Sequence, residues 1–355
     1  MTYSEAIEAL MDMRMRVMTD GRKDCGSAKA LGVIPGADQL NQVFVEQDLV
    51  GARLEFAHRL IRQHEQDVRE LMKLLYEHRL KKAGWDIDLH FMSSELFFAA
   101  AMGAAGSYLV QLSIGIAPQL FSLAAEIEAL QHADSQALQG VYAKGANSLD
   151  SWYPWMTSLD EGRPSSAQIA LDAALLIYFH ELAHIIFGHC DYQPIDSSEA
   201  RALELDADFN AGSMFTLWLP HLGDVARCPV NDEALLSRLA RASFLVGVVF
   251  KALSSRSTDY HFPTVRAECY FAGGTFALER APQSTFFGEH KPSFWTGRRE
   301  RVVNPMLDAL RQSSLKTFAG TEQELAMDLA EMEKITYPAR NRLKDGPLRK
   351  LLMRT

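Results

Sequence analysis

The sequence predicts a mainly α-helical protein of the α+β class, with one small β-structured segment. Apolar residues recur at helical spacing over most of the chain, whereas residues 107–116 alternate between apolar and small or polar side chains, the period of a strand. Of the 355 residues, 48% are hydrophobic and 23% are charged. This length and composition are typical of a globular protein with a sizeable core.

Charge and cysteine usage argue against some classes of function. The formal net charge of −9 does not favour binding to nucleic acid. The cysteines are far apart in the sequence and form no C-x-x-C pair, which indicates a reducing compartment rather than a disulfide scaffold. Glu5, Glu8 and Asp12 interrupt the segment in which a signal peptide needs an apolar core. We therefore expect a cytoplasmic protein.

The first region, residues 1–90, is predicted to be helical. Residues 50–82 carry apolar side chains at helical spacing, which predicts a long surface helix with one apolar face. Within it, Glu65 precedes Arg69 by four residues, the favourable polarity for an ion pair along a helix.

The β signal lies in residues 87–116. No charged residue occurs between Glu95 and Glu126, so this stretch is long enough to span a bilayer. It also contains several glycines, a proline and glutamines, and its second half alternates as a strand does. We therefore expect a buried hairpin or strand here, with a membrane segment as the less favoured alternative.

The rest of the chain is predicted to consist of helices joined by loops, one of them at residues 281–300. Ser165 with Gln168, and Thr321 with Glu324, are capping-box pairs that start two of the helices. The residues after Tyr337 are basic, and we expect them to form a mobile tail. The predicted helices span residues 118–133, 167–187, 197–218, 233–254, 264–280, 302–317 and 322–335.

The helix of residues 167–187, which Gly188 ends, contains an H-E-x-x-H motif. Residues four apart share one face of a helix, so His180 and His184 can direct imidazole nitrogens at the same ion. Glu181 lies one step round the helix, where a general base can take a proton from water. This pattern indicates a catalytic zinc site, which needs a third protein ligand and leaves one position for water.

The nearest candidate for the third ligand is His189. It follows His184 by five residues and His180 by nine, which places it about half a turn from the ligand face. We therefore favour His189 as a polar residue just past the helix end, with ligation as the weaker alternative. Cys190 lies beyond the end of the helix too and is a weak candidate for a fourth, closing ligand.

A stronger candidate lies on the next predicted helix. Glu204, Ala207, Asp208 and Ala211 fall at i, i+3, i+4 and i+7 and therefore form one stripe. The alanines permit close packing against the histidine helix, so that Glu204 can ligate the metal. Asp208 can accept a hydrogen bond from the N–H of a ligand histidine. We expect Asp206 to point elsewhere and to be solvated.

With H-E-x-x-H followed after twenty residues by E-x-x-A-D, the chain resembles the gluzincin metallopeptidases. It is most similar to the minigluzincin and CAAX-prenyl-protease-like group and to bacterial proteins like the phage-exclusion peptidase Lit. The resemblance covers about residues 95–275. It implies a zincin-like catalytic domain at residues 91–280, and residues 281–355 are then a C-terminal helical extension with a basic tail. It implies zinc ligation by His180, His184 and Glu204, with Glu181 as the base and Asp208 behind a ligand histidine.

The resemblance also implies a small antiparallel sheet or hairpin whose edge strand precedes the zinc helix and pairs with extended substrate. Residues 107–115 fit that strand, and Leu109, Val110 and Gln111 are its predicted substrate-binding residues. The aromatic loop of residues 147–166 either lines the cleft or is a surface loop anchored by buried tryptophans.

A further element of the group, His-Pro followed by Arg, is similar to His261, Pro263 and Arg266 of this chain, although Phe262 separates the first two. The resemblance implies that His261 stabilises the oxyanion and that Arg266 holds the site together. Tyr260 is the alternative oxyanion donor.

We expect a zinc-dependent metallopeptidase that acts on a protein or peptide substrate, without membrane association. The large flanking regions are compatible with a regulatory protein partner. One alternative is a regulatory protease of the ImmA type that acts on a repressor, although that group usually has Asn where Asp208 stands. The other is a non-catalytic zinc-containing binding protein, which the presence of Glu181 disfavours because a structural zinc site has no use for a base.

Overall fold

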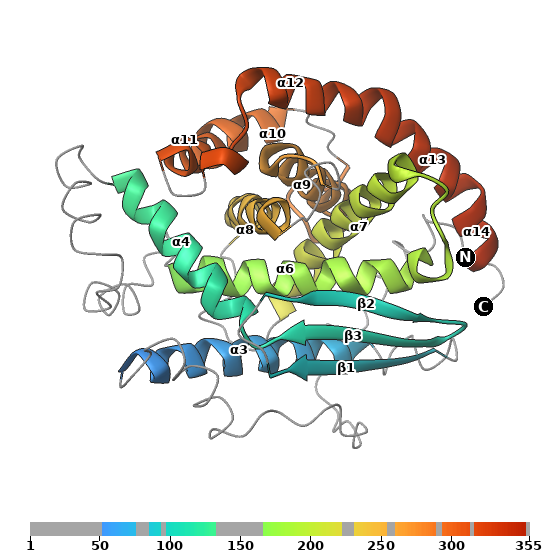
Figure 1. Cartoon of the computed structure of the whole chain (residues 1–355), viewed down its shortest axis with the longest axis horizontal. Helices are drawn as coiled ribbons and strands as arrows, with labels where there is room; N and C mark the ends of the chain where they lie inside the picture. The colour runs from blue at the N-terminus through green and yellow to red at the C-terminus, as the bar shows by residue number, and fades with distance from the viewer. Residues whose placement is uncertain are drawn as a thin grey trace.

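The structure is a computed structural model and describes residues 52–75, 85–93, 97–132, 166–221, 231–253, 260–288, 293–312 and 316–352. It confirms a mainly helical fold with one small sheet (Figure 1). The predictions for the aromatic loop before residue 166, and for Ser165 as a helix cap, lie outside the described residues.

The predicted N-terminal surface helix is α3, Ala52–Leu75. It packs its apolar face, including Ile61, Val68 and Leu71, into the core. Arg69 Nε donates to Glu65 Oε1 at 2.6 Å, which is the expected i,i+4 ion pair.

The β signal resolves into three strands: β1, Asp86–Met92, β2, Ala99–Ala104, and β3, Ser107–Ser113. Their order is β1-β3-β2, with β2 antiparallel and β1 parallel to β3. The expected hairpin is therefore present as β2 and β3, but the sheet is mixed rather than antiparallel.

The predicted edge strand is wrong. The strand of residues 107–113 is the central one, so Leu109, Val110 and Gln111 pair with β1 on one side and with β2 on the other. Their backbone groups are used within the sheet and cannot pair with a substrate. The free edge next to the helical layer is β2, which lies closer to α6 than β3 does (Figure 1).

Helix α6, Ser166–Ile186, runs through the centre of the molecule, and most of its side chains are buried (Figure 1). Among the described residues it is the one helix long and apolar enough to cross a membrane, and 94% of its most apolar window is buried inside the protein. The uncharged stretch considered above as a membrane segment instead forms β2, β3 and the start of α4.

Three helices, α4, α7 and α8, pack against α6, and a fourth, α9, packs against α7 and α8; all four lie within two residues of their predicted bounds. Helix α7 packs most extensively against α9. At their crossing, a Cβ added to Gly212 would lie 1.9 Å from the carbonyl oxygen of Tyr270, and one added to Gly273 would lie 1.8 Å from that of Phe209. Only glycine allows this approach. The four helices are α4, Ile116–His132, α7, Ser197–Trp218, α8, Asp232–Leu253, and α9, Pro263–Arg280.

The C-terminal extension forms an arc of helices along one side of the molecule (Figure 1). The predicted loop of residues 281–300 contains α10, and the capping box of Thr321 and Glu324 is present at the start of α12. The helices are α10, Ser293–Arg298, α11, Asn304–Gln312, α12, Glu322–Glu331, α13, Tyr337–Asp345, and α14, Pro347–Leu352.

The expectation of a mobile tail after Tyr337 is wrong for the residues that the structure describes. Helices α13 and α14 occupy this segment, and Leu343 and Leu348 bury their side chains against Ala202 and Leu203 of α7. The basic residues had suggested a mobile tail, but Arg340 is 8% exposed and forms a buried ion pair. The extension therefore packs on the helix that carries the predicted third ligand.

Candidate metal centre

Helix α6 presents the H-E-x-x-H motif near its C-terminal end. His180 and His184 are one helical turn apart, and their ring centroids are separated by 4.8 Å. Gly188 then adopts a left-handed conformation with φ of 78°, which ends the helix and turns the chain at His189.

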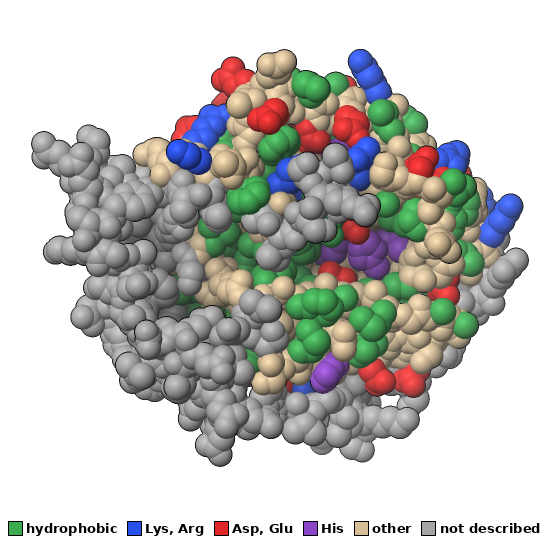
Figure 2. Space-filling view, in the orientation of Figure 1, with side chains coloured by type: hydrophobic (Ala, Val, Ile, Leu, Met, Phe, Trp, Pro, Cys, Tyr) green, Lys and Arg blue, Asp and Glu red, His purple; other side chains and the backbone are tan. Residues whose placement is uncertain are grey.

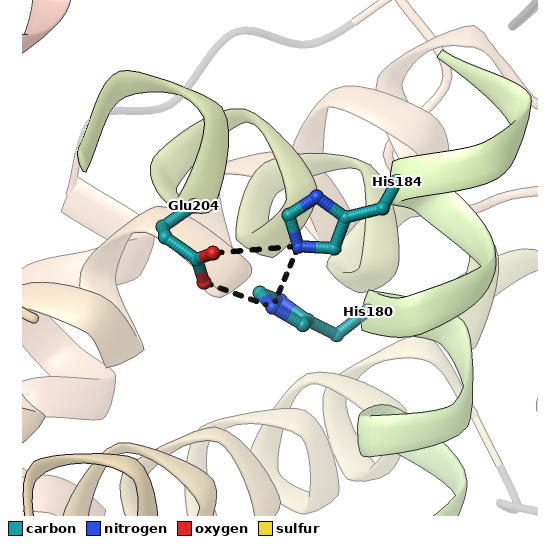
Figure 3. Close-up of side chains that lie close together, drawn as sticks. All are labelled: His180, His184 and Glu204. Carbon is teal, nitrogen blue, oxygen red and sulfur yellow. Dashed lines mark hydrogen bonds and ion pairs between the residues drawn. The ribbon is translucent and has the colours of Figure 1, made fainter. Parts of the chain in front are cut away.

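Glu204 reaches the two histidines from α7. This helix starts at Asp196, whose side chain accepts a hydrogen bond from the Glu199 N–H, and it packs against α6. The Glu204 carboxylate oxygens lie 3.2 Å from His180 Nε2 and 3.6 Å from His184 Nε2, and the two Nε2 atoms are 3.1 Å apart (Figure 3). The three predicted ligands therefore converge on one point.

This donor set fits zinc. Zinc bound tetrahedrally to imidazole nitrogen and carboxylate oxygen, at about 2.0–2.2 Å, places neighbouring ligand atoms about 3.3–3.5 Å apart. The separations of 3.1–3.6 Å among the triad atoms bracket that range. Figure 3 shows that the candidate ligands His180 and His184 of α6 and Glu204 of α7 point toward one another.

The electrostatics of the triad also favour a cation. Burial opposes protonation of His180, but hydrogen bonds with Asp208 and Glu204 outweigh this effect and raise its pKa to about 9. Burial lowers the pKa of His184 to about 3, so this imidazole is neutral and can donate an electron pair. The carboxylates therefore stabilise a positive charge at this point, either a proton on His180 or a metal cation.

The structure brings Asp208 and Arg266 to the back of His180, as the sequence predicts. Asp208 Oδ1 lies 2.9 Å from His180 Nδ1. Arg266 of α9 binds the same carboxylate with two hydrogen bonds, from Nε at 2.7 Å and from Nη2 at 2.5 Å. The guanidinium lies over the rings of Phe250 and Tyr260. Asp208 can thus hold the proton of His180 on Nδ1 and leave Nε2 free to bind a metal.

Glu181 is buried beside the triad and close to β2. Burial raises the pKa of its carboxyl to about 7, and the backbone N–H of Ala101 on β2 partly offsets this rise. A carboxylate with a pKa near neutrality is suited to exchange protons with water. The predicted base therefore lies between the candidate metal ligands and the sheet.

The edge of β2 faces this base. The Ser113 N–H donates to the Phe98 carbonyl at 2.9 Å, so these two residues form a hydrogen-bonded pair of the antiparallel ladder. Because such pairs alternate, the backbone groups of Ala99, Ala101 and Gly103 point away from β3. Apart from Met102 the strand consists of small residues, and it exposes its end toward the hairpin turn.

The surroundings of His261 argue against its predicted oxyanion role. Its Nδ1 lies 2.6 Å from Asp328 Oδ1 of α12, and its Nε2 lies 3.2 Å from Thr336 Oγ1. Both ring nitrogens therefore have partners in the C-terminal extension. The neighbouring Tyr260 stacks on Phe250 beneath the Arg266 guanidinium, and the charge of Glu204, together with burial, raises the pKa of its hydroxyl.

Sequence reasoning placed Asp206 wrongly and underused His189. Asp206 is not solvated: it is 2% exposed and lies 3.2 Å from His189 Nε2. Asn210, four residues later, donates to the same carboxylate. This second polar pair at helical spacing within an otherwise apolar helix was the signal for another buried polar face. Tyr270 was also missed, and its hydroxyl lies 3.3 Å from His180 Nδ1.

Figure 2 shows histidine and acidic side chains in a hollow of the molecular surface, between the sheet and the C-terminal helices. Apolar side chains line the rim nearest the sheet. No protein-family model, curated protein or solved structure matches the chain. The resemblance to gluzincins therefore remains a prediction, supported by the motif and by the geometry of the site.

Proposed function

We propose that the protein is a zinc-dependent metallopeptidase of the gluzincin type, which hydrolyses a peptide bond in a protein or peptide substrate. The observation that carries this proposal is the convergence of His180 Nε2, His184 Nε2 and the Glu204 carboxylate within 3.6 Å, beside a buried glutamate. A structural zinc site would close its fourth position with a side chain, and no further His, Cys, Asp or Glu joins this group among the described residues.

Zinc in this site would supply Lewis acidity that polarises a carbonyl oxygen and acidifies water. Glu181 takes the proton from the attacking water and delivers it to the leaving amine. Its pKa of about 7 allows it to accept and release a proton near neutral pH. Tyr260 replaces His261 as the proposed donor to the oxyanion, because its side chain lies in the field of Glu204 and Glu181.

Extended substrate is proposed to add to β2 rather than to β3. The outward N–H and carbonyl groups of Ala99 and Gly103, together with the Ala101 carbonyl, offer both donors and acceptors to a peptide laid along the edge. Substrate in this position would pass directly over Glu181, since the Ala101 N–H already interacts with that carboxylate. The small side chains of Ala99, Ala100 and Ala101 leave room for the substrate backbone.

The test combines zinc analysis with hydrolysis of a degenerate peptide library. We expect about one zinc per wild-type chain, full retention in Glu181→Gln and loss in Glu204→Gln, with His90→Ala as a control for an exposed histidine of the sheet. We expect the wild type to cleave a subset of peptides and Glu181→Gln to cleave none. Hydrolysis that persists in Glu181→Gln would contradict the assignment of Glu181 as the general base.

Absence of zinc from the wild type after reconstitution would contradict the whole proposal. Zinc binding without cleavage of any peptide would favour the non-catalytic alternative. Cleavage confined to a single folded protein, with the peptide library untouched, would favour regulatory proteolysis of the ImmA type.

A further inference from the structure

A third histidine, His189, lies behind the ligand His184. The Nδ1 atoms of the two rings are 3.1 Å apart, and the rings meet edge to face with an interplanar angle of 75°. His189 is 4% exposed, so this contact is shielded from water. The ring nitrogen of His184 that does not face the triad therefore has a histidine as its partner.

Metal ligation determines the direction of this hydrogen bond. His184 directs Nε2 at Glu204 and His180, so as a neutral ligand it carries its proton on Nδ1. His184 Nδ1–H then donates to His189 Nδ1. His189 must in turn carry its own proton on Nε2, which faces Asp206 Oδ2 at 3.2 Å. The three groups thus have one consistent arrangement of protons.

Asp206 is held from the other side by the C-terminal extension. Arg340 of α13 donates from Nε to Asp206 Oδ1 at 2.6 Å, and its guanidinium lies over the ring of Phe209. Asn210 Nδ2 donates to Asp206 Oδ2 at 3.0 Å. Asp206 and Arg340 are 2% and 8% exposed, so the contacts that link His189 to α13 are buried.

The two ligand histidines are thus supported in parallel ways. Asp208 contacts His180 directly and is bound by Arg266 of α9. Asp206 contacts His184 through His189 and is bound by Arg340 of α13. Behind each ligand histidine lies an aspartate of α7, and each aspartate is bound by a buried arginine from a different helix.

We propose that His189 is a positioning residue for the zinc ligand His184, and that Asp206 and Arg340 hold it in place. The C-terminal helix α13 thereby contributes to metal affinity without touching the metal. This inference rests on the proposed function only in that the triad binds zinc. It assigns to the C-terminal extension a part in building the metal site.

The first experiment measures zinc affinity by competition with a chelator for full-length wild type, His189→Leu and His189→Gln. Loss of a hydrogen-bond partner behind a metal-bound histidine weakens metal binding by about 10- to 100-fold, and we expect this loss in His189→Leu. We expect part of the affinity to return in His189→Gln, because its side-chain oxygen can accept from His184. Absorption of the Co²⁺-loaded proteins should shift in His189→Leu, since it reports the ligand geometry.

The second experiment compares two arginines of α13. We expect Arg340→Met and Asp206→Asn to weaken zinc binding in the same direction as His189→Leu. Arg342→Met is the matched control, because Arg342 lies on the same helix and pairs with a different carboxylate, Glu199, at 2.7 Å. We expect its zinc affinity to equal that of the wild type. Thermal unfolding of the metal-free proteins shows which variants are folded.

Wild-type zinc affinity in folded His189→Leu would overturn this inference while leaving the proposed function intact. Equal weakening of zinc binding by Arg340→Met and Arg342→Met would contradict the proposed role of α13 in supporting His184. If His189→Leu does not fold, His189→Gln and Asp206→Asn decide, and wild-type affinity in both would overturn the inference. Absence of zinc from the wild type would overturn the proposed function and this inference together.

Discussion

At the scale of single residues, the candidate site depends on charged side chains that are paired with one another. His180, Glu204, Asp208 and Arg266 form one connected group in which positive and negative side chains alternate. A buried carboxylate is costly without such partners. The arginine is thus needed for the stability of the fold as well as for the orientation of the histidine.

Arg266→Met should lower both the stability of the protein and its zinc affinity. Removing one partner of a buried ion pair costs about 3–5 kcal/mol, because Asp208 is left as an uncompensated charge. Asp208 then also orients His180 less well. Denaturant unfolding of the metal-free protein and chelator competition measure the two effects.

Arg238→Met is the control for that prediction. Arg238 binds Asp172 with two hydrogen bonds, from Nε at 2.7 Å and from Nη2 at 2.6 Å, and this pair is also buried. We expect a similar loss of stability with unchanged zinc affinity. If both variants lose zinc equally, the effect of Arg266 is on folding alone.

At the scale of secondary-structure elements, the sheet offers the site one open edge. The backbone of β2 alternates, so adjacent residues differ in what they pair with. Ala100 lies in a hydrogen-bonded pair with Gln111, whereas Ala99 points its N–H away from β3. Proline substitutions can therefore separate the structural use of the strand from its proposed use in substrate binding.

Ala99→Pro should retain the fold and zinc, because proline is tolerated at the first residue of a strand. It should lower kcat/KM by about 2- to 12-fold, since it removes one outward donor and a hydrogen bond is worth about 0.5–1.5 kcal/mol. Ala100→Pro removes a ladder hydrogen bond instead and should lower the melting temperature. Peptide hydrolysis and thermal unfolding of both variants test this. Unchanged kcat/KM in Ala99→Pro would exclude β2 as the substrate strand.

At the scale of the whole molecule, helices from distant parts of the sequence meet at the triad. A ligand that binds the folded state alone stabilises it, by about 2.7 kcal/mol when its free concentration is a hundred times its Kd. We therefore expect a chelator to lower the melting temperature of the wild type, and added zinc to restore it. Glu204→Gln should melt at the same temperature with and without chelator.

Local geometry was predictable from the sequence, and long-range pairing was not. Helical spacing places His180 and His184 on one face of their helix, and it places Glu204 and Asp208 on one face of theirs. The order of the strands was not predictable, because β1 and β3 both alternate in burial and alternation does not distinguish a central strand from an edge.

The same limit applies to the polar partners. His261 is bound by a carboxylate 67 residues away, and Asp206 by an arginine 134 residues away. No period in the sequence connects residues so far apart. Both partners, Asp328 and Arg340, belong to the C-terminal extension. The basic composition of its last part predicted a mobile tail, whereas Arg340 is buried against Asp206.

Two glycines at the crossing of α7 and α9 determine the geometry of the candidate site, although neither has a side chain that takes part in it. Gly212 and Gly273 let the helices approach closely. A methyl group added at either glycine would lie within 2 Å of a carbonyl oxygen of the other helix. Tyr270 and Arg266 stand on α9, and Glu204 and Asp208 on α7. A Gly→Ala substitution at the crossing would force the two helices apart and shift all four side chains at once. The site is therefore sensitive to mutation at positions that carry no functional group.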